Sequence, residues 1–259
     1  MSKYSRLNTL LDLLAERGAL DVDDVARELT VSAATIRRDL DTLARQQLLT
    51  RTHGGAVPNA TAYDLPLRYK TAKHAPEKQR IGKAAVELVT PGAIVASNGG
   101  TTTTEVARHI ATSAELQHAG SQVTFVTNAL NIANELTVRP HLKVVVTGGV
   151  ARTQSYELIG PLATPILERL SLDVVFLGVN GIDAEHGACA HHEGEASINT
   201  LMVARAKQVV VVADGSKLGR RAFARICPIE DVDVLVTDAS APADAVSRIE
   251  QAGVRVIKA

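Results

Sequence analysis

Aromatic residues and cysteines are scarce in this sequence, and their scarcity limits both the core and the chemistry. Tryptophan is absent, and aromatic residues make up 3% of the 259 positions. The two cysteines, Cys189 and Cys227, lack the CxxC spacing of a zinc site and do not form a disulfide framework. Because hydrophobic residues still account for 46% of the chain, the core must be aliphatic, which favours a parallel α/β sheet.

Net charge and long apolar runs are also missing. The 28 Lys and Arg residues balance 28 Asp and Glu residues, so overall charge predicts attraction neither to nucleic acid nor to a membrane. The N-terminus has no apolar signal core, and no stretch approaches the length of a membrane span. We therefore expect a cytoplasmic protein without a membrane partner, in which any binding to DNA depends on local charge.

Residues 1–57 have the pattern of a winged helix-turn-helix. Apolar spacing predicts one helix that ends near Gly18 and a second that Asp21 caps. Ser32 is a good N-cap for a third helix beginning at the next residue, since its hydroxyl can accept from a free amide of the first turn. β-compatible residues followed by two glycines, at 50–55, then suit a hairpin wing.

The third helix predicts a face that reads DNA. An apolar stripe of Ile36, Leu40 and Leu43 anchors one side, and hydroxyl and guanidinium groups lie on another. Arginine can bind guanine bidentately, while hydroxyls mostly fix register on phosphates. Residues 35–57 hold four basic and two acidic side chains, against four and six in residues 1–34, so positive charge gathers here. The expected contacts to double-stranded operator DNA are Ser32, Thr35, Arg37, Arg38, Arg51 and His53. The alternative is a small helical bundle with a solvated arginine face.

The rest of the chain divides into a connector, 58–76, and a second domain, 77–259. The connector carries three prolines, and alternation at Leu65, Leu67 and Tyr69 is compatible with an edge strand added to the following domain. From residue 77, short Val/Ile/Leu runs alternate with amphipathic helices, the pattern of a buried parallel sheet. The expected strands are 93–96, 123–126, 142–146, 173–179, 208–213, 234–237 and 254–257, and the expected helices lie from 77 to 88 and near 103–111, 129–137, 162–169, 195–206 and 242–252.

Polar residues follow six of these strands. In open α/β sheets, ligands bind in the crevice beyond the carboxyl ends of the strands, so this polar rim predicts a binding site. The alternative for any single turn is that Gly and Asn only serve the connection between strand and helix. The expected effector-binding residues are Asn98, Gly99, Gly100, Thr101, Thr102, Thr103, Thr127, Asn128, Gly148, Gly149, Asn180, Glu195, Asp214 and Lys217.

The segment 99–104 predicts a phosphate cradle. Its glycines let backbone amides turn inward, its threonine hydroxyls can donate to an oxyanion, and the N-terminus of the following helix favours negative charge. The spacing is neither GxxxxGK[ST] nor GxGxxG, so a nucleotide is not indicated. At another strand end, Asp214 suits a sugar hydroxyl and Lys217 a phosphate. The alternatives are a threonine-capped helix at the first place and a surface ion pair at the second.

Histidines and glutamates gather in one loop, at His186, His191, His192, Glu193 and Glu195. The loop lacks the HExxH spacing of a helical zinc site, and we expect neither a metal nor a cofactor. Two interpretations stay open: contact of Glu193 or Glu195 with an effector, and an ordinary loop that leads into a helix.

Six segments of the chain are distinctive together. They are VSAATIRRDL at 31–40 with Leu43, RTHGGA at 51–56, NGGTTT at 98–103, VTN at 126–128, TGG at 147–149 and ADGSK at 213–217. Over nearly the whole chain they resemble the DeoR family of bacterial transcriptional regulators. The resemblance implies a winged helix-turn-helix joined to a sensor domain that is similar in fold to ribose-5-phosphate isomerase and binds a phosphorylated sugar or related metabolite. Asn98 stands where the family pattern has aspartate, so it keeps the hydrogen bonding and loses the charge and the base.

The predicted function is repression of a carbohydrate-utilisation operon. A phosphorylated sugar at the rim would shift the protein between DNA-bound and released states, and a homodimer or homotetramer would match repeated half-sites. The alternative is a sugar-phosphate isomerase or deaminase with an accessory N-terminal domain, using Lys217, Asp214 and Glu195 as acid-base groups. Asn98 in place of a carboxylate and the complete recognition helix count against an enzyme, so we expect none.

Overall fold

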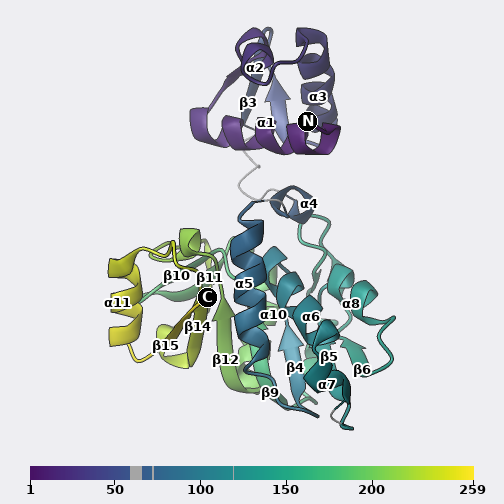
Figure 1. Cartoon of the computed structure of the whole chain (residues 1–259), viewed down its shortest axis with the longest axis vertical. Coiled ribbons are helices and arrows are strands. Elements are labelled where there is room, and N and C mark those ends of the chain that lie inside the picture. The colour runs from purple at the N-terminus through teal and green to yellow at the C-terminus, as the bar shows by residue number, and fades with distance from the viewer. Residues whose placement is uncertain (59–65, 72, 119) are drawn as a thin grey trace. The chain divides into compact units, whose positions relative to one another are not determined.

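The computed structural model describes residues 1–58, 66–71, 73–118 and 120–259. The chain forms two compact units, Met1–Ala72 and Lys73–Ala259 (Figure 1), and each is described by itself. Part of the expected connector, residues 59–65, lies outside the described residues. The boundary between the two units falls within the segment 58–76.

Three helices build the first unit, and their ends follow from capping residues. They are α1 (Lys3–Arg17), α2 (Val22–Glu28) and α3 (Ala33–Arg45). α1 ends at Gly18, which takes the left-handed conformation at φ 73° that glycine adopts without strain. The Asp21 carboxylate accepts from two amides of α2, and the Ser32 hydroxyl accepts from the Thr35 amide at 3.2 Å. All three predicted helices are confirmed.

A three-stranded antiparallel sheet forms the wing, in the order β1-β3-β2. Its strands are β1 (Leu20–Asp21), β2 (Leu49–Arg51) and β3 (Gly55–Pro58). A Cβ atom at Gly55 would lie 1.7 Å from the Leu20 carbonyl oxygen, so β1 and β3 can approach only because this residue is glycine. The hairpin of β2 and β3 confirms the predicted wing. β1 is too short to leave a pattern in the sequence.

The segment after the wing differs from the expected edge strand. Leu67 and Tyr69 lie in a short helix, α4 (Leu67–Lys70), so a strand is wrong for these two, and Leu65 lies outside the described residues. The reason is tertiary packing. Tyr69 joins the buried cluster of the first unit, and its ring stacks on that of Tyr4 with centroids 6.2 Å apart, instead of extending the sheet of the second unit.

Seven parallel strands form the central sheet of the second unit (Figure 1). They are β4 (Ile94–Ser97), β5 (Val123–Thr127), β6 (Leu142–Val146), β9 (Leu172–Leu177), β12 (Ala206–Val212), β14 (Val234–Thr237) and β15 (Arg255–Lys258). Each corresponds to a predicted strand, and all neighbours pair in parallel. The expected α/β class is therefore confirmed.

Successive residues of these strands point to opposite faces of the sheet, and helices cover both faces. The first face, with Val95, Phe125 and Phe176, packs in one buried cluster with residues of four helices; these helices are α5 (Ala75–Val86), α6 (Thr101–Thr112), α7 (Ala114–His118) and α8 (Leu130–Leu136). The second face, with Ala96 and Val175, packs on three others: α9 (Thr164–Leu167), α10 (Glu193–Arg205) and α11 (Ala243–Gln251). Figure 1 shows α5 and α6 in front of the sheet. The unit is thus a three-layer sandwich.

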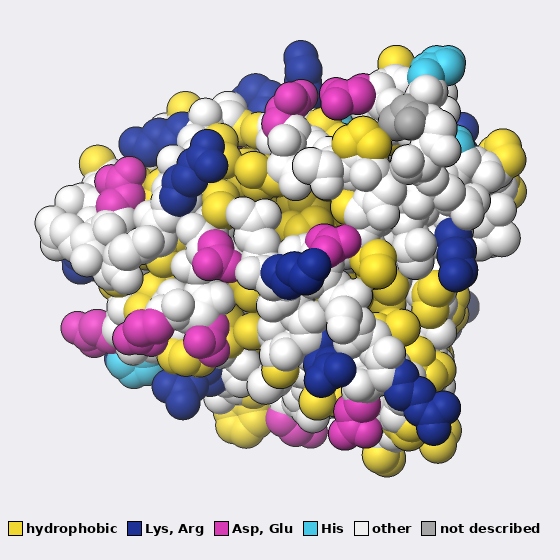
Figure 2. Space-filling model, turned by 90° about the horizontal axis from the view of Figure 1, so that it is seen from below, with side chains coloured by type: hydrophobic (Ala, Val, Ile, Leu, Met, Phe, Trp, Pro, Cys, Tyr) yellow, Lys and Arg dark blue, Asp and Glu magenta, His cyan; other side chains and the backbone are white. Residues whose placement is uncertain are grey.

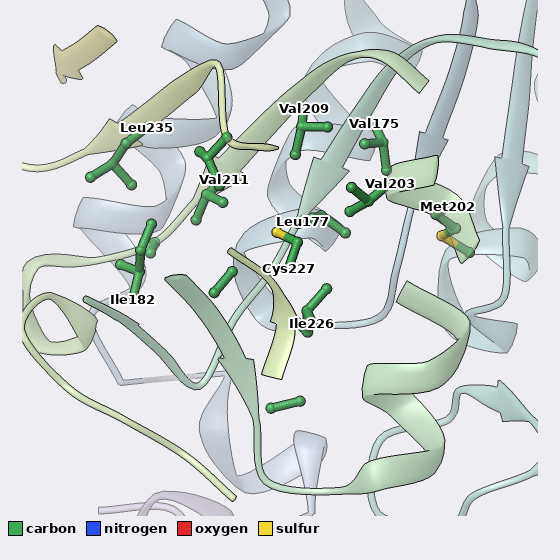
Figure 3. Packing of buried hydrophobic residues seen from close by; sticks show 14 of the residues in the cluster. Val175, Leu177, Ile182, Met202, Val203, Val209, Val211, Ile226, Cys227 and Leu235 are labelled. Atoms are coloured by element: carbon green, nitrogen blue, oxygen red, sulfur yellow. The ribbon is translucent and has the colours of Figure 1, made fainter. Parts of the chain in front are cut away.

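A second, smaller sheet has no counterpart among the predicted strands. Its strands β10 (Gly181–Asp183), β11 (Gly187–Ala190) and β13 (Ala224–Cys227) pair antiparallel, and its Ile182 and Cys227 belong to one buried cluster with Val209 and Val211 of β12 (Figure 3). β7 (Val150–Ala151) and β8 (Leu158–Ile159) form a separate hairpin, and 3-10 turns occur at η1 (Gly215–Lys217) and η2 (Ile229–Asp231). None of these short elements carries a Val/Ile/Leu run of the kind that marked the strands of the central sheet.

The order of the strands reverses at the neighbours β4 and β9. From β4 the sheet continues through β5 to β6 on one side, while β9, β12, β14 and β15 follow on the other. Such a reversal opens a crevice at the carboxyl ends of the two central strands, because the segments that follow them go to opposite faces. The loops after β4 and β9 therefore stand where this type of fold binds ligands.

Charged side chains of both signs are spread over the surface. On the face that Figure 2 shows, Lys and Arg side chains are interspersed with Asp and Glu, as the formal net charge of zero leads one to expect. Attraction of a polyanion must therefore come from local clusters. Within the described part of the chain, no helix combines the length and the apolar character that crossing a membrane requires.

Candidate functional site

The recognition helix α3 offers an exposed polar face. Arg37 and Arg38 are both exposed, and Ser32 is exposed where the helix begins, with Thr35 half-buried. Arg37 reaches Asp23 of α2 at 3.9 Å, and an ion pair this exposed contributes little to stability. This face can therefore meet the edges of a DNA groove without any change in the core.

The acidic residue that follows the two arginines turns inward. Asp39 is buried and pairs with Arg6 of α1. Removing one partner of a buried pair leaves the other charge uncompensated, so this pair fixes α3 against α1. This role was not predicted from the sequence, although the spacing of Asp39 from Ile36 and Leu40 puts it at the edge of the apolar stripe.

The two residues of the wing that were predicted to contact DNA, Arg51 and His53, have different surroundings. Arg51 Nε donates to Asp41 Oδ1 at 2.9 Å, and the same guanidinium donates to the Gly55 carbonyl. Arg51 thus braces the wing against α3 within the unit. His53 is exposed at the bend of the hairpin. Contact of either side chain with DNA stays a prediction.

In the second unit, the carboxyl end of β4 is clasped to that of β9. Asn98 is buried; its Nδ2 donates to the Gly178 carbonyl at 2.9 Å, and its Oδ1 accepts from the Gly178 amide at 2.8 Å. A Cβ atom at Gly178 would lie 3.3 Å from Thr103 Cγ2, a distance that shows how closely the two loops pack. Asn98, predicted as a rim residue, therefore holds the reversal point together.

Helix α6 begins at this same point. Gly100 is its N-cap, and the Thr103 and Thr104 hydroxyls donate to the Gly100 carbonyl at 3.1 and 2.7 Å. The amides of the first turn, from Thr101 on, have no carbonyl partner inside the helix, and with the helix dipole they favour an anion. The backbone amides, more than these two hydroxyls, make this an anion-binding place.

Glu157 fills the space beside the preceding loop residue. Its Oε1 accepts from the Gly99 amide at 2.6 Å, and the residue is 2% exposed. A Cβ atom at Gly99 would lie 2.5 Å from Glu157 Cγ, so the close approach requires glycine here. Glu157 was not predicted from the sequence, because it lies between β7 and β8 and belongs to no recognisable motif.

Two further charged side chains stand beside Glu157. Arg152 Nη1 donates to Glu195 Oε1 at 3.0 Å, with the two side chains 12% and 9% exposed. Burial first, and then the charge of Glu195, raise the pKa of Glu157 well above its usual range. Glu195, which was predicted, therefore lies near Glu157, and Arg152, which was not predicted, balances one negative charge of the pair.

The end of β5 supports the hairpin that carries Glu157. The Thr127 hydroxyl oxygen accepts from the Ala129 amide at 3.0 Å. The Asn128 carbonyl accepts from the Leu158 amide at 2.7 Å, and Asn128 Nδ2 donates to the Leu158 carbonyl at 3.3 Å. Among the described residues, the buried Asn128 Oδ1 has no hydrogen-bond partner. These two predicted residues lie at the crevice, and one of them leaves a buried acceptor unused.

Two glycines after β6 allow the same hairpin to pass close by. Gly148 and Gly149 have φ of 73° and 125°, in the region that favours glycine. A Cβ atom at Gly149 would lie 2.9 Å from the Ile159 carbonyl oxygen. The backbone conformation at both predicted residues therefore favours glycine, whether or not a ligand binds there.

The remaining predicted rim residues serve turns. Asn180 Oδ1 accepts from the His191 amide at 3.0 Å. Asp214 is buried and caps η1, where it accepts from the Ser216 amide at 3.1 Å. Lys217 ends that turn and is half-buried. At the end of β12, the carboxylate thus shapes the loop that carries the lysine.

The histidines of the predicted loop lie at two separate places in the fold. His192 Nδ1 accepts an amide hydrogen bond at 3.1 Å where α10 begins, while His186 lies beside Asp183 and Glu185 at the turn of the small sheet. Arg221 contacts the same two carboxylates, at 3.5 and 2.8 Å. Within the described ranges, this partly exposed group is the one that could surround a cation, and Arg221 already balances one of its two negative charges.

A winged helix with an exposed arginine face and an α/β unit with an anion-favouring loop define a ligand-responsive DNA-binding protein. Comparison with known families supports that class: the DeoR-like helix-turn-helix domain matches residues 6–62, and the DeoR C terminal sensor domain matches residues 73–239. The chain belongs to the DeoR family of DNA-binding transcriptional regulators. The resemblance read from the sequence is thereby confirmed.

Individual relatives agree with this assignment. The HTH-type transcriptional regulator GlpR of Haloferax volcanii is 37% identical over 258 residues, covering 99% of this chain and 98% of the relative. The glycerol-3-phosphate regulon repressor of Escherichia coli K12 is 31% identical over 242 residues, covering 93% of each chain. A ribose 5-phosphate isomerase A structure from Methanocaldococcus jannaschii resembles part of the fold, with a TM-score of 0.42, 16% identity and coverage of 56% and 55%. Because the full-length relatives are named regulators, the alternative of an enzyme is not favoured.

Proposed function

We propose that this protein represses genes of carbohydrate utilisation and leaves its operator when a phosphorylated sugar or related ester binds the second unit. The observation that carries the proposal is the start of α6 at the reversal point between β4 and β9. There, glycine-flanked amides and a helix N-terminus face the crevice in which α/β sheets bind ligands.

The DNA-binding half rests on α3 and the wing. Arg37 and Arg38 have the exposure and the fork geometry to reach base edges in a major groove. Ser32 and Thr35, at the start of the helix, are placed to fix register on phosphates, and Arg51 and His53 would contact the backbone beside the groove. Two such DNA-binding domains in a homodimer or homotetramer would match repeated half-sites of an operator.

The effector-binding half rests on complementary polar groups. Amides of Thr101, Thr102 and Thr103 suit a phosphate group, and Lys217 at the end of β12 supplies positive charge at the same edge of the sheet. The unused Asn128 Oδ1 suits a hydroxyl donor of the same ligand, since a buried acceptor without a partner costs stability. One relative carries the name of a glycerol-3-phosphate repressor, and that compound combines these two features.

A thermal-shift screen of the full chain tests the effector half. Phosphorylated sugars, glycerol 3-phosphate and their unphosphorylated parents would be compared, because a ligand of the folded state at about 100 times its Kd adds about 2.7 kcal/mol of stability. We expect shifts confined to phosphorylated compounds. Thr102→Val should reduce the shift, while Thr112→Val, at the exposed opposite end of the same helix, should leave it unchanged.

Two outcomes would contradict the proposal. Equal increases in Tm with phosphorylated and unphosphorylated sugars would show that the protein does not recognise the phosphate group. No shift with any of these compounds, in a protein that still binds specific DNA, would place the ligand outside the class of phosphorylated sugars.

A further inference from the structure

The hairpin of β7 and β8 is fastened to the carboxyl edge of the sheet through short contacts. The Leu158 amide donates to Asn128 at 2.7 Å, and the Leu130 amide donates to the Tyr156 carbonyl at 2.9 Å. Tyr156 has φ 61°, a left-handed conformation that costs a residue other than glycine some free energy. The next residue is Glu157, whose carboxyl reaches Gly99 in the loop between β4 and α6. The hairpin is therefore held in a strained shape that delivers one carboxyl to Gly99.

The buried surroundings of Glu157 favour its protonated form. The residue is 2% exposed, and the Arg152 guanidinium already pairs with Glu195 at 3.0 Å. Burial and the nearby charge of Glu195 raise the pKa of Glu157. One proton on Glu157 and the guanidinium of Arg152 then leave this group of three side chains with no net charge.

Loss of this proton would have a local cost. It would place a second negative charge in a site where Glu157 is 2% exposed, and a buried charge without a partner is strongly unfavourable. The added charge would lie next to the Gly99 amide, one residue before the N-cap of α6. It would repel a ligand phosphate at that helix.

We propose that Glu157 is a positioning residue of the effector site: its carboxyl ties the hairpin of β7 and β8 to the Gly99 amide, and loss of its proton to solvent places a negative charge beside the start of α6 and weakens the binding of phosphorylated ligands. This inference rests on the proposed function, because it concerns affinity at the same crevice. Glu157 acts through the loop and the hairpin, and the ligand contacts α6.

The groups around Glu157 set the direction of the pH dependence. Glu195 faces it from α10 and Arg152 from its own hairpin, while the β4 loop contributes the Gly99 amide. The pKa of Glu157 is raised above 4.5, its usual value, because the folded state favours the neutral form. The resulting stabilisation is fully present below 4.5 and is lost as the pH rises through the raised pKa of the folded state.

The first measurement needs no ligand. The unfolding equilibrium of the full chain is followed from about pH 5 to about pH 9, where one proton bound only by the folded state changes the equilibrium constant about tenfold per pH unit. Glu157→Gln can still accept from the Gly99 amide and has no carboxyl to titrate, so we expect it to fold and to lack this part of the pH dependence. Glu168→Gln, an exposed change of the same kind, should retain it.

The second measurement adds glycerol 3-phosphate as the probe. The ratio of its Kd for the wild type to its Kd for Glu157→Gln should rise with pH, because the titration of the ester is common to both proteins and cancels. Glu157→Met, which keeps the length of the side chain and loses the hydrogen bond from the Gly99 amide, should bind weakly at every pH. If Gln restores the affinity and Met does not, the hydrogen bond positions the loop, and filling the space is not sufficient.

Each outcome decides the inference. A pH dependence of unfolding that is the same in the wild type and Glu157→Gln would show that the proton is not on this pair. If the ratio of Kd values does not change with pH while the unfolding measurement gives the expected result, the proton on Glu157 would be confirmed and its role in ligand binding would be contradicted. If the probe binds no variant at any pH, the link to this effector fails with the proposed function, while the unfolding arm still decides the protonation.

Discussion

Asn98 and Gly178 exchange two hydrogen bonds across the point where the order of the sheet reverses. The Asn98 side chain gives one, to the carbonyl at 2.9 Å, and receives one, from the amide at 2.8 Å. Only a side chain with a donor and an acceptor on one planar group can satisfy both atoms of a backbone unit in this way. The amide at position 98 therefore has a structural role that aspartate would fill in part.

Asn98→Asp should destabilise the second unit at neutral pH. The carboxylate keeps the bond from the Gly178 amide but turns its second oxygen towards the carbonyl, at an expected cost of about 1–3 kcal/mol. In acid the protonated carboxyl can donate, so the loss should shrink. Chemical denaturation at two pH values measures it, with the exposed Gln122→Glu as the matched control. Equal stability of Asn98→Asp and wild type at pH 7 would contradict the two-bond clasp.

Thr30→Gly should stabilise the first unit. Thr30 has φ 54°, and the bond from the Val31 amide to the Ala26 carbonyl closes the end of α2 around a left-handed residue, the place where glycine is usual. Relief of strain at a β-branched residue is worth about 1 kcal/mol after the entropy that glycine loses. Thermal unfolding measures it. The same substitution at Thr52, whose φ is not positive, should not stabilise, and a lower Tm for Thr30→Gly would refute the argument.

Tyr69→Ala should destabilise the first unit although Tyr69 follows the wing. The ring is buried against Tyr4, and removal of a buried aromatic side chain costs about 3–5 kcal/mol. Tyr69→Phe keeps the ring and loses only the hydroxyl that donates to Gln46, an expected cost of about 1 kcal/mol. Urea unfolding, read by the circular dichroism of the helices, ranks the two variants. A loss of less than about 1 kcal/mol for the alanine variant would mean that α4 does not stabilise the unit.

Arg38→Ala should weaken specific DNA binding by about 1–3 kcal/mol and leave folding unchanged. The side chain is exposed on α3, so its loss disturbs no core contact. Fluorescence anisotropy with a labelled operator at fixed salt measures the effect, and Arg248→Ala, exposed on α11, serves as the control. Unchanged operator affinity would remove Arg38 from the reading face.

The sequence predicted what depends on regular spacing. The stripe of Ile36, Leu40 and Leu43, the caps Asp21 and Ser32, and the short Val-rich runs each carry a local physical reason for a helix or strand, and all reappear in the structure. The small sheet and the β7–β8 hairpin were missed because their strands, two to four residues long, lack the Val-rich runs that marked central strands of similar length.

The site was predicted less completely, because its geometry depends on contacts between distant parts of the chain. Glycines and Asn98 singled out the loop after β4 as a candidate site, but nothing near Glu157 or Arg152 in the sequence signals that they meet Gly99 and Glu195. Tyr69 shows the same limit, since its alternation with Leu67 fits a strand and its packing on Tyr4 decides for a helix.

Release of DNA by a phosphate ester tests the central claim most directly. An operator fragment selected by the full chain would be titrated with the protein at fixed salt, with and without each phosphorylated sugar that shifts its Tm, and with the unphosphorylated parents. We expect one ester to weaken operator affinity by about 5-fold to 150-fold, a coupling of about 1–3 kcal/mol, while its parent has no effect. Operator affinity that stays the same with every ester bound to the protein would contradict the account.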